Sequence, residues 1–192
     1  MGSEIYDIRK HSISANDLLL FDANIWIYLW SPPNSPDTVL SNAIGEYSRI
    51  YTEMAKQGIK ILTSWLVLSE FVNSLARKSF YSHLNLYPGS FKNNEFKRYR
   101  SSRDFLPARK AIASFAKKIF DKSQFISHNS AALCYDNILK YYESEADFND
   151  AIYVEDSVTA HYKIVTHDED FKRIWGTTKP TILTANPQML KK

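Results

Sequence analysis

Short runs of apolar residues alternate along the chain with longer segments in which apolar residues recur at helical spacing. An uninterrupted apolar run is typical of a strand that is buried on both faces of a parallel sheet. The clearest run, Leu18–Phe21, stops abruptly at Asp22, so a carboxylate directly follows a predicted strand. The other predicted strands cover residues 59–62, 124–127, 163–166 and 181–183.

Helical spacing of apolar residues fills the intervals between these strands. Gly58 ends the first predicted helix, and Thr63 and Ser64 are residues of the kind expected at the N-terminal cap of the second. The alternation predicts a single α/β domain over residues 1–192, in which a central, mainly parallel sheet is flanked by helices in three layers. The predicted helices cover residues 39–54, 65–76, 111–120, 131–142 and 148–162.

The alternation is interrupted at about residues 80–107, where the sequence becomes rich in aromatic and basic residues. We interpret this stretch as an inserted loop or a short helical excursion. Basic residues interleaved with aromatic ones suit phosphate contacts and base stacking, but a solvated loop that packs its aromatic side chains on the core has the same composition. The candidate RNA contacts are Lys97, Arg98, Arg100 and Arg103.

Acidic residues follow two of the predicted strands. Asp22 comes after the first strand, and Asp168 comes after the strand at residues 163–166. Ligands of open parallel sheets bind outside the carboxyl ends of the strands, so both carboxylates are candidates for one site. Asp150 falls in the first turn of a helix, where the helix dipole alone also favours a carboxylate. Asp147 fits the N-cap of that helix, and we interpret it as structural.

Glu70 is surrounded by apolar residues on the helix predicted after Ser64. A helix that is apolar nearly all round is a buried helix, and a carboxylate within it needs a compensating partner. Glu70 lies too far from Ser64 to form a capping box, and Arg77 and Lys78 lie outside i+3 or i+4 reach. The partner is therefore either a cation from elsewhere in the fold or a site shared with other acids.

Bringing these acids together raises their pKa values by mutual repulsion unless a cation neutralises them. Oxygen ligands alone favour Mg²⁺ or Mn²⁺ over zinc or copper. Mg²⁺ retains water molecules and binds phosphate oxygens, which predicts phosphodiester chemistry. The predicted metal ligands and catalytic residues are Asp22, Glu70, Asp150 and Asp168.

The composition of the chain indicates in which compartment, and with what kind of partner, this chemistry takes place. The 24 basic and 21 acidic residues give a formal charge of +3, which hints at a polyanionic partner without establishing one. The single cysteine, Cys134, excludes an internal disulfide and a cysteine-rich zinc site, and so favours a reducing, cytoplasmic compartment. Its neighbours in the sequence are apolar, which predicts a buried thiol. The longest apolar stretch, residues 18–30, is too short to span a membrane, and residues 1–17 resemble neither a signal peptide nor an anchor. We therefore expect a soluble protein.

Four stretches of the sequence together resemble the PIN-domain nucleases, and especially the VapC-like toxins. They are Leu-Leu-Phe-Asp22-Ala-Asn24-Ile-Trp-Ile-Tyr, Thr63-Ser-Trp-Leu-Val-Leu-Ser-Glu70-Phe, Asn149-Asp150-Ala-Ile and Ile-Val-Thr166-His-Asp168-Glu-Asp170-Phe171. Each stretch is short, but their order and their placement on the predicted elements extend over roughly residues 18–175. The segment at 80–107 departs from the resemblance, because it is longer than such toxins usually have.

The resemblance implies that the four acids hold one or two Mg²⁺ or Mn²⁺ ions. Asn24 and Thr166 would then hold a carboxylate or a water in place. His167 adjoins the last motif without belonging to it, and we interpret it as a surface histidine. The implied activity is that of an endoribonuclease, in which a metal-activated water attacks the phosphorus in line.

The resemblance also implies a biological setting, namely the toxin of a toxin–antitoxin pair with an antitoxin protein as its partner. A homodimer is a further implied assembly, and the helix predicted at residues 39–54 is one candidate face. Two alternatives remain open: an RNA-processing PIN-like nuclease that has no antitoxin, and a non-catalytic RNA-binding or scaffold domain.

Overall fold

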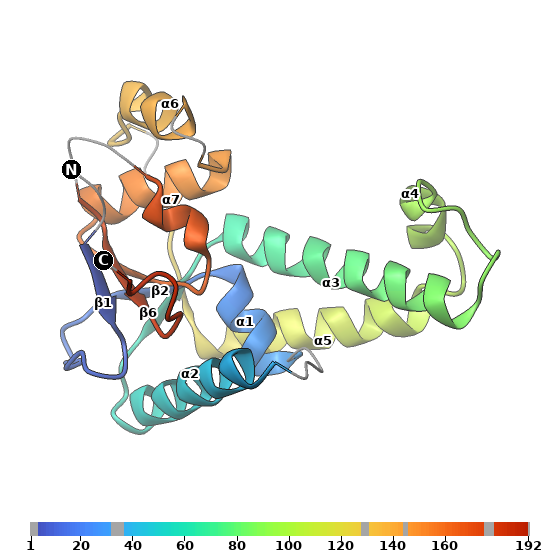
Figure 1. Cartoon of the computed structure of the whole chain (residues 1–192), viewed down its shortest axis with the longest axis horizontal. Helices are drawn as coiled ribbons and strands as arrows, with labels where there is room; N and C mark the ends of the chain where they lie inside the picture. The colour runs from blue at the N-terminus through green and yellow to red at the C-terminus, as the bar shows by residue number, and fades with distance from the viewer. Residues whose placement is uncertain (1–3, 32–36, 128–130, 144–145, 175–178, 192) are drawn as a thin grey trace.

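The computed structural model of the chain describes residues 4–31, 37–127, 131–143, 146–174 and 179–191. Its strands form a six-stranded sheet in the order β1-β6-β5-β2-β3-β4, in which all neighbouring strands are parallel (Figure 1). The predicted α/β class with a central parallel sheet is therefore confirmed. The strands are β1 (Glu4–Asp7), β2 (Leu19–Phe21), β3 (Ile61–Thr63), β4 (Gln124–Phe125), β5 (Lys163–Val165) and β6 (Thr181–Thr184).

The two central strands, β2 and β5, are completely covered by the rest of the protein. Leu19, Leu20, Ile164 and Val165 have no exposed surface, as expected for apolar runs in a doubly covered sheet. The chain proceeds from β2 to β3 and β4 on one side of the sheet, and from β5 to β6 on the other. The boundary between β2 and β5 is therefore a topological switch point, where open α/β sheets bind their ligands.

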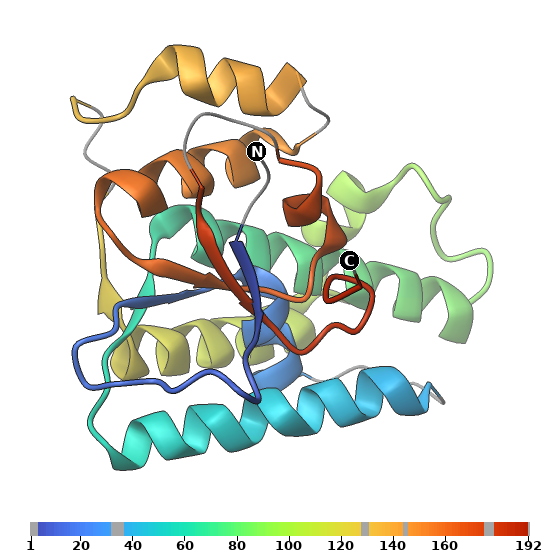
Figure 2. The same cartoon turned by 60° about the vertical axis from the view of Figure 1, so that its left-hand side comes forward.

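Helices cover both faces of this sheet. Helix α7 lies over one side with α6 stacked outside it, and α2 lies on the opposite side (Figures 1 and 2). Among the described residues, no helix is long and apolar enough to cross a membrane. The helices are α1 (Ala23–Trp30), α2 (Thr38–Lys56), α3 (Trp65–Leu86), α4 (Phe96–Arg100), α5 (Leu106–Lys122), α6 (Tyr135–Glu143), α7 (Phe148–Thr159) and the short 3₁₀ helix η1 (Glu169–Lys172).

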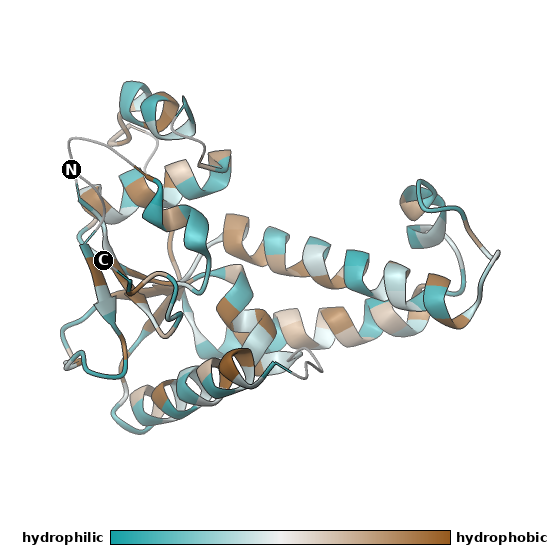
Figure 3. Cartoon of the chain, in the orientation of Figure 1, coloured by the Kyte–Doolittle hydropathy of each residue, from teal (hydrophilic) through white to brown (hydrophobic). Residues whose placement is uncertain are grey.

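Hydrophobic residues concentrate on the strands and form stripes along the helices (Figure 3). Helix α2 shows why such a stripe does not by itself identify an interface. Its apolar residues Ala43, Tyr47, Ile50 and Met54 are all buried in the core of the chain. These four residues pack within the chain, whereas Val39 at the start of the same helix is 53% exposed, and the homodimer through this helix stays a prediction. Gly58, whose φ is +68°, follows the end of this helix as predicted.

The segment between residues 76 and 113, which we call the arm, projects from the body of the protein (Figure 1). Helix α3 continues to Leu86, ten residues beyond its predicted end, and packs along α5. The loop after Leu86 and α4 form the tip of the arm. The stretch read as an insert is thus part helix and part loop, and its aromatic rings surround Tyr99, which is only 2% exposed. These rings form a local core.

Two predictions about buried residues are wrong. Cys134 is exposed just before α6, so its thiol is not part of a buried helix face. Helix α3 is not buried all round either, because Trp65 is 63% exposed and lies against the ring of Phe125. Strand β1 and helix α1 were not predicted. β1 is a four-residue edge strand without an apolar run, and α1 is so uniformly apolar that it shows no helical periodicity.

Candidate active site

The first two acids lie at the switch point of the sheet. Asp22 follows β2 and caps α1, where its side chain accepts the backbone N–H of Ala23. Asp168 comes shortly after β5 and caps η1 by accepting the backbone N–H of Asp170. Because β2 and β5 are adjacent parallel strands, with Phe21 paired to Val165, their carboxyl ends bring both carboxylates to one edge of the sheet.

The other two acids are carried to this edge by helices. Ser64 directly follows β3 and caps α3 by accepting the N–H of Val67, which places Glu70 in the second turn of that helix. Helix α7 begins with Asp147 as its N-cap, as predicted, through a bond from the N–H of Asn149. Asp150 therefore does not serve as the cap. It lies in the first turn and is only 9% exposed.

The four acids share one electrostatic environment. Burial is the largest effect, and it raises the pKa of Asp22 to about 6, that of Glu70 to about 7 and that of Asp150 to about 9. Repulsion adds to burial: Asp168 raises the pKa of all three, and Asp22 raises the pKa of Glu70 and Asp150. Asp147 acts on Glu70 and Asp150 in the same direction.

Cations do not compensate these charges within the described part of the chain. No lysine, arginine or histidine there forms an ion pair with Asp22, Glu70 or Asp150. Among the same residues, no group of three or more acidic, histidine or cysteine side chains lies close enough together to hold a metal ion as the side chains stand. The arrangement is an open cluster of oxygen donors, which suits Mg²⁺, because this ion keeps several waters and binds proteins through one or two carboxylates.

Asn24 and Thr166 fix the carboxylate of Asp22. Its Oδ2 atom accepts hydrogen bonds from Asn24 Nδ2 at 2.6 Å and from Thr166 Oγ1 at 2.7 Å. Asn24 Nδ2 also donates to Thr166 Oγ1, which in turn accepts the backbone N–H of Asp168. The network thus ties the end of β2 to the segment after β5. Both residues therefore donate a hydrogen bond to the carboxylate of Asp22.

His167 is half-buried rather than a simple surface residue. Its Nδ1 atom lies 3.1 Å from the hydroxyl of Tyr47, and its ring meets those of Tyr28 and Tyr47 edge-on. Burial lowers its pKa. Beside it opens a cavity of about 600 Å³, between α1, the start of α2 and the segment after β6. Asp168 lines this cavity, so a ligand held there reaches one of the acids.

Sequence reasoning missed two residues that bear on the cluster. Asp147 caps α7 but also raises the pKa of Glu70 and Asp150, so its structural role does not exclude an electrostatic one. Tyr153 has a raised pKa because it is buried and because Glu70, Asp22 and Asp150 lie nearby. Its signal in the sequence was its i+3 position relative to Asp150, which puts both on one face of α7.

The four candidate RNA contacts are all exposed residues of the arm. They do not share one role. Arg98 forms an ion pair with Glu95 at 2.8 Å, whereas Lys97 and Arg100 line a large pocket between α3, α4 and α5. Arg103 lies outside the lining of that pocket.

The sequence matches no protein-family model, and no curated protein is significantly similar to it. Solved structures do resemble it. VapBC2 from Rickettsia felis, bound to a DNA fragment of its promoter, is 14% identical and has a TM-score of 0.52, over 86% of this chain and 96% of that one. PAE2754 from Pyrobaculum aerophilum is 16% identical and has a TM-score of 0.49, over 96% and 94% of the two chains. The likeness to the first structure concerns the fold.

Proposed function

We propose that this chain, which has a VapC-like PIN-domain fold, is a metal-dependent endoribonuclease. The observation that carries the proposal is the convergence of Asp22, Glu70, Asp150 and Asp168 at the switch point of the parallel sheet, where repulsion from Asp168 raises the pKa of the other three acids. Asp22 and Asp150 are buried without a cationic partner among the described residues, which destabilises the fold unless a cation binds among the acids. A divalent cation is the partner whose charge and oxygen preference fit it.

Mg²⁺ or Mn²⁺, as one or two ions held by these four acids, would supply an activated water and would stabilise charge on the phosphoryl oxygens. The residues of the chain prepare the site for this. The bonds from Asn24 and Thr166 hold Asp22 in one rotamer, which keeps a donor oxygen fixed at the sheet edge. Asp150 is only 9% exposed, and exclusion of water around its carboxylate would strengthen its attraction for a bound divalent cation.

The biological setting that we propose is a toxin–antitoxin pair, with an antitoxin protein as the partner. The support is the fold shared with the VapBC2 structure, together with the sequence motifs of VapC-like toxins. An exposed, unpaired thiol at Cys134 agrees with a reducing compartment such as the cytoplasm. The alternative of an RNA-processing nuclease shares the same chemistry and differs only in having no antitoxin. Co-purification with the product of a neighbouring gene distinguishes the two.

The test compares RNA cleavage by the wild type with that by Asp22→Asn and Asp150→Asn. Each change keeps the size of the side chain and removes a charged ligand, so we expect cleavage in Mg²⁺ or Mn²⁺ to fall by at least about a hundredfold. Cleavage is followed by mapping the new 5′ ends of a structured RNA. Chelation of divalent ions should abolish it for the wild type.

Asp121→Asn is the matched control, because Asp121 is an exposed residue of α5 whose only recorded ion pair within the described chain is with Lys117. It should cleave like the wild type. Full metal-dependent RNA cleavage by both site variants, or cleavage by the wild type that survives chelation, would contradict the proposal. Wild type that binds RNA but does not cut it in either metal would instead favour the non-catalytic alternative.

A further inference from the structure

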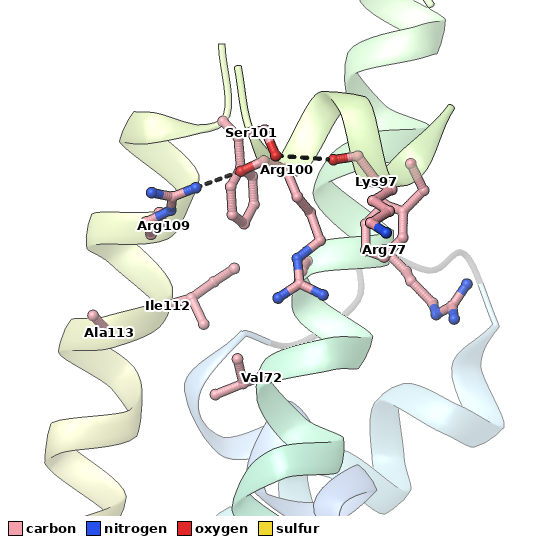
Figure 4. A pocket seen from close by; sticks show the side chains of 11 residues that line it. Val72, Arg77, Lys97, Arg100, Ser101, Arg109, Ile112 and Ala113 are labelled. Atoms are coloured by element: carbon pink, nitrogen blue, oxygen red, sulfur yellow. Dashed lines mark hydrogen bonds between the residues drawn. The ribbon is translucent and has the colours of Figure 1, made fainter. Parts of the chain in front are cut away.

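A pocket of about 830 Å³ lies in the arm, between α3, α4 and α5 (Figure 4). Its floor is apolar and includes Val72, Ile112 and Ala113. Arg100 extends from α4 into the space between the two long helices, above Val72 and Ile112 (Figure 4). The pocket is therefore a concave surface with an apolar base and charged walls.

The walls carry positive charge only. Arg77, Lys97, Arg100 and Arg109 line the pocket, and its described lining includes no acidic residue. Within the described part of the chain, none of these four cations forms an ion pair. Arg98, which lies on the same short helix, is by contrast neutralised by Glu95.

Aromatic rings hold the cations close to one another. The guanidinium groups of Arg77 and Arg100 lie 5.0 and 5.6 Å from the centre of the Phe96 ring. Arg109 stacks over Phe105 and donates a hydrogen bond to the carbonyl of Arg100. Like charges gathered around one ring repel each other, and an anion bound between them relieves that repulsion. Arginine in particular offers the planar fork that matches phosphate.

Of the α3 residues that line the pocket, only Arg77 lies on the helix face that carries Glu70, because Val72 and Ala76 are turned about 160° and 120° away from that face. Arg77 follows Glu70 by seven residues, which at 100° per residue places the two within about 20° of the same helix face. Their separation along the axis is about 10 Å, equal to roughly three nucleotide steps of a stacked strand. A strand that leaves the pocket at Arg77 and follows that face of α3 therefore passes from the arm towards Glu70.

We propose that the arm pocket binds the phosphate backbone of single-stranded RNA a few nucleotides away from the acidic cluster. This inference rests on the proposed function for its choice of ligand. An acidic peptide also fits the charge of the pocket, but a peptide continuing along α3 brings its carboxylates against Glu70 and Asp150. A phosphodiester strand avoids this repulsion when a divalent cation is bound at the acids, because the cation binds the phosphate oxygens.

The experiment measures binding of a fluorescein-labelled single-stranded RNA of about twelve nucleotides, a length within the usual site sizes. Fluorescence anisotropy is recorded in EDTA, which excludes cleavage and reports binding by the arm alone, and again with Mg²⁺ before cleavage proceeds, at a series of salt concentrations. The proteins are the wild type, Arg77→Gln, Arg100→Gln and Arg100→Lys. Lys110→Gln is the matched control. The substitution removes the same charge, and Lys110 is exposed on α5 without lining the pocket.

Each glutamine variant in the pocket should weaken binding about five- to tenfold and reduce the slope of log affinity against log salt by about 0.7, the value for one lost phosphate contact on a single strand. Arg100→Lys should keep the slope because it keeps the charge. Lys110→Gln should behave like the wild type. Circular dichroism verifies that each variant is folded, and the exposed positions of Arg77 and Arg100 make this the expected result.

Unchanged RNA affinity in both glutamine variants would overturn the proposal, and so would an equal loss in Lys110→Gln, which would indicate a diffuse charge effect. Competition by polyglutamate at matched charge concentration would overturn it in favour of an acidic protein partner. The nuclease proposal is tested separately from the pocket proposal. If the pocket variants lose RNA binding but the wild type cleaves no RNA, the nuclease proposal is wrong and the pocket proposal is supported.

Discussion

Asp22 and Asp150 are both buried acids of one cluster, but they differ in how the protein compensates their charge. Asp22 accepts hydrogen bonds from Ala23, Asn24 and Thr166, and these bonds oppose the rise in its pKa caused by burial. Every effect found for Asp150 raises its pKa instead. With no cation bound, Asp22 is therefore mostly ionised at neutral pH, whereas Asp150 is mostly protonated.

The Thr166 hydroxyl connects three groups of the site, and its removal tests the network. Thr166→Val keeps the shape but leaves Asp22 without one donor and the Asp168 N–H without its acceptor. We expect a loss of about 1–3 kcal/mol in stability and a ten- to hundredfold weaker binding of Mn²⁺. Denaturant titration and calorimetry measure the two effects. Thr166→Ser retains the hydroxyl and should retain both properties, and an unchanged Mn²⁺ affinity in Thr166→Val would show that the network does not serve a metal site.

At the scale of elements, the residues at the N-termini of three helices position the acidic cluster. Ser64 caps α3, Asp147 caps α7 and Asp22 caps α1, so three of the local turns that begin helices also deliver side chains to the sheet edge. The caps at Ser64 and Asp147 could be predicted because capping depends on one residue and the next few backbone N–H groups, whereas the cap at Asp22 belongs to a helix that was not predicted. The extent of α3 was not readable in the same way. Its outer half is stabilised by packing against α5, which is distant in sequence.

Ser64→Ala tests whether this cap supports the site. The N–H of Val67 loses its acceptor, and the free energy of unfolding should fall by about 1 kcal/mol. Urea denaturation measures the change. Ser69→Ala, an exposed position within the same helix, is the matched control and should cause no loss, because alanine is the better helix former there. Equal stabilities of the two variants would show that α3 does not depend on its cap.

At the scale of the whole molecule, the acidic cluster makes stability depend on pH. Asp22, Glu70 and Asp150 have raised pKa values in the folded state, so the folded state binds more protons than the unfolded state between pH 4 and pH 9. The stability they contribute is fully present below their ordinary pKa values and is lost as pH rises through the folded ones.

Thermal unfolding in EDTA should therefore show a melting temperature that falls from about pH 5 to pH 9. Asp150→Asn, which removes the group with the highest pKa, should flatten this fall and raise the melting temperature at pH 8 by roughly 4 °C or more, since about 1 kcal/mol corresponds to 2–4 °C in a chain of this size. Added Mg²⁺ should restore the wild type most strongly at high pH. A melting temperature of the wild type that rises over this interval would contradict the shared cluster.

The sequence by itself determined the parallel sheet and most of its elements, because apolar runs, helical periodicity and capping residues are local signals, but it did not show β1 or α1. It also determined the ends of β2 and β5 at which Asp22 and Asp168 lie. Only the tertiary structure decided that α2 turns its apolar stripe into the core, that Cys134 is exposed and that α3 runs out into an arm. It likewise brought Arg77 and Arg109 to the pocket that Lys97 and Arg100 line. Such facts depend on which segments meet in space, and contacts between distant segments leave no periodic mark on either one.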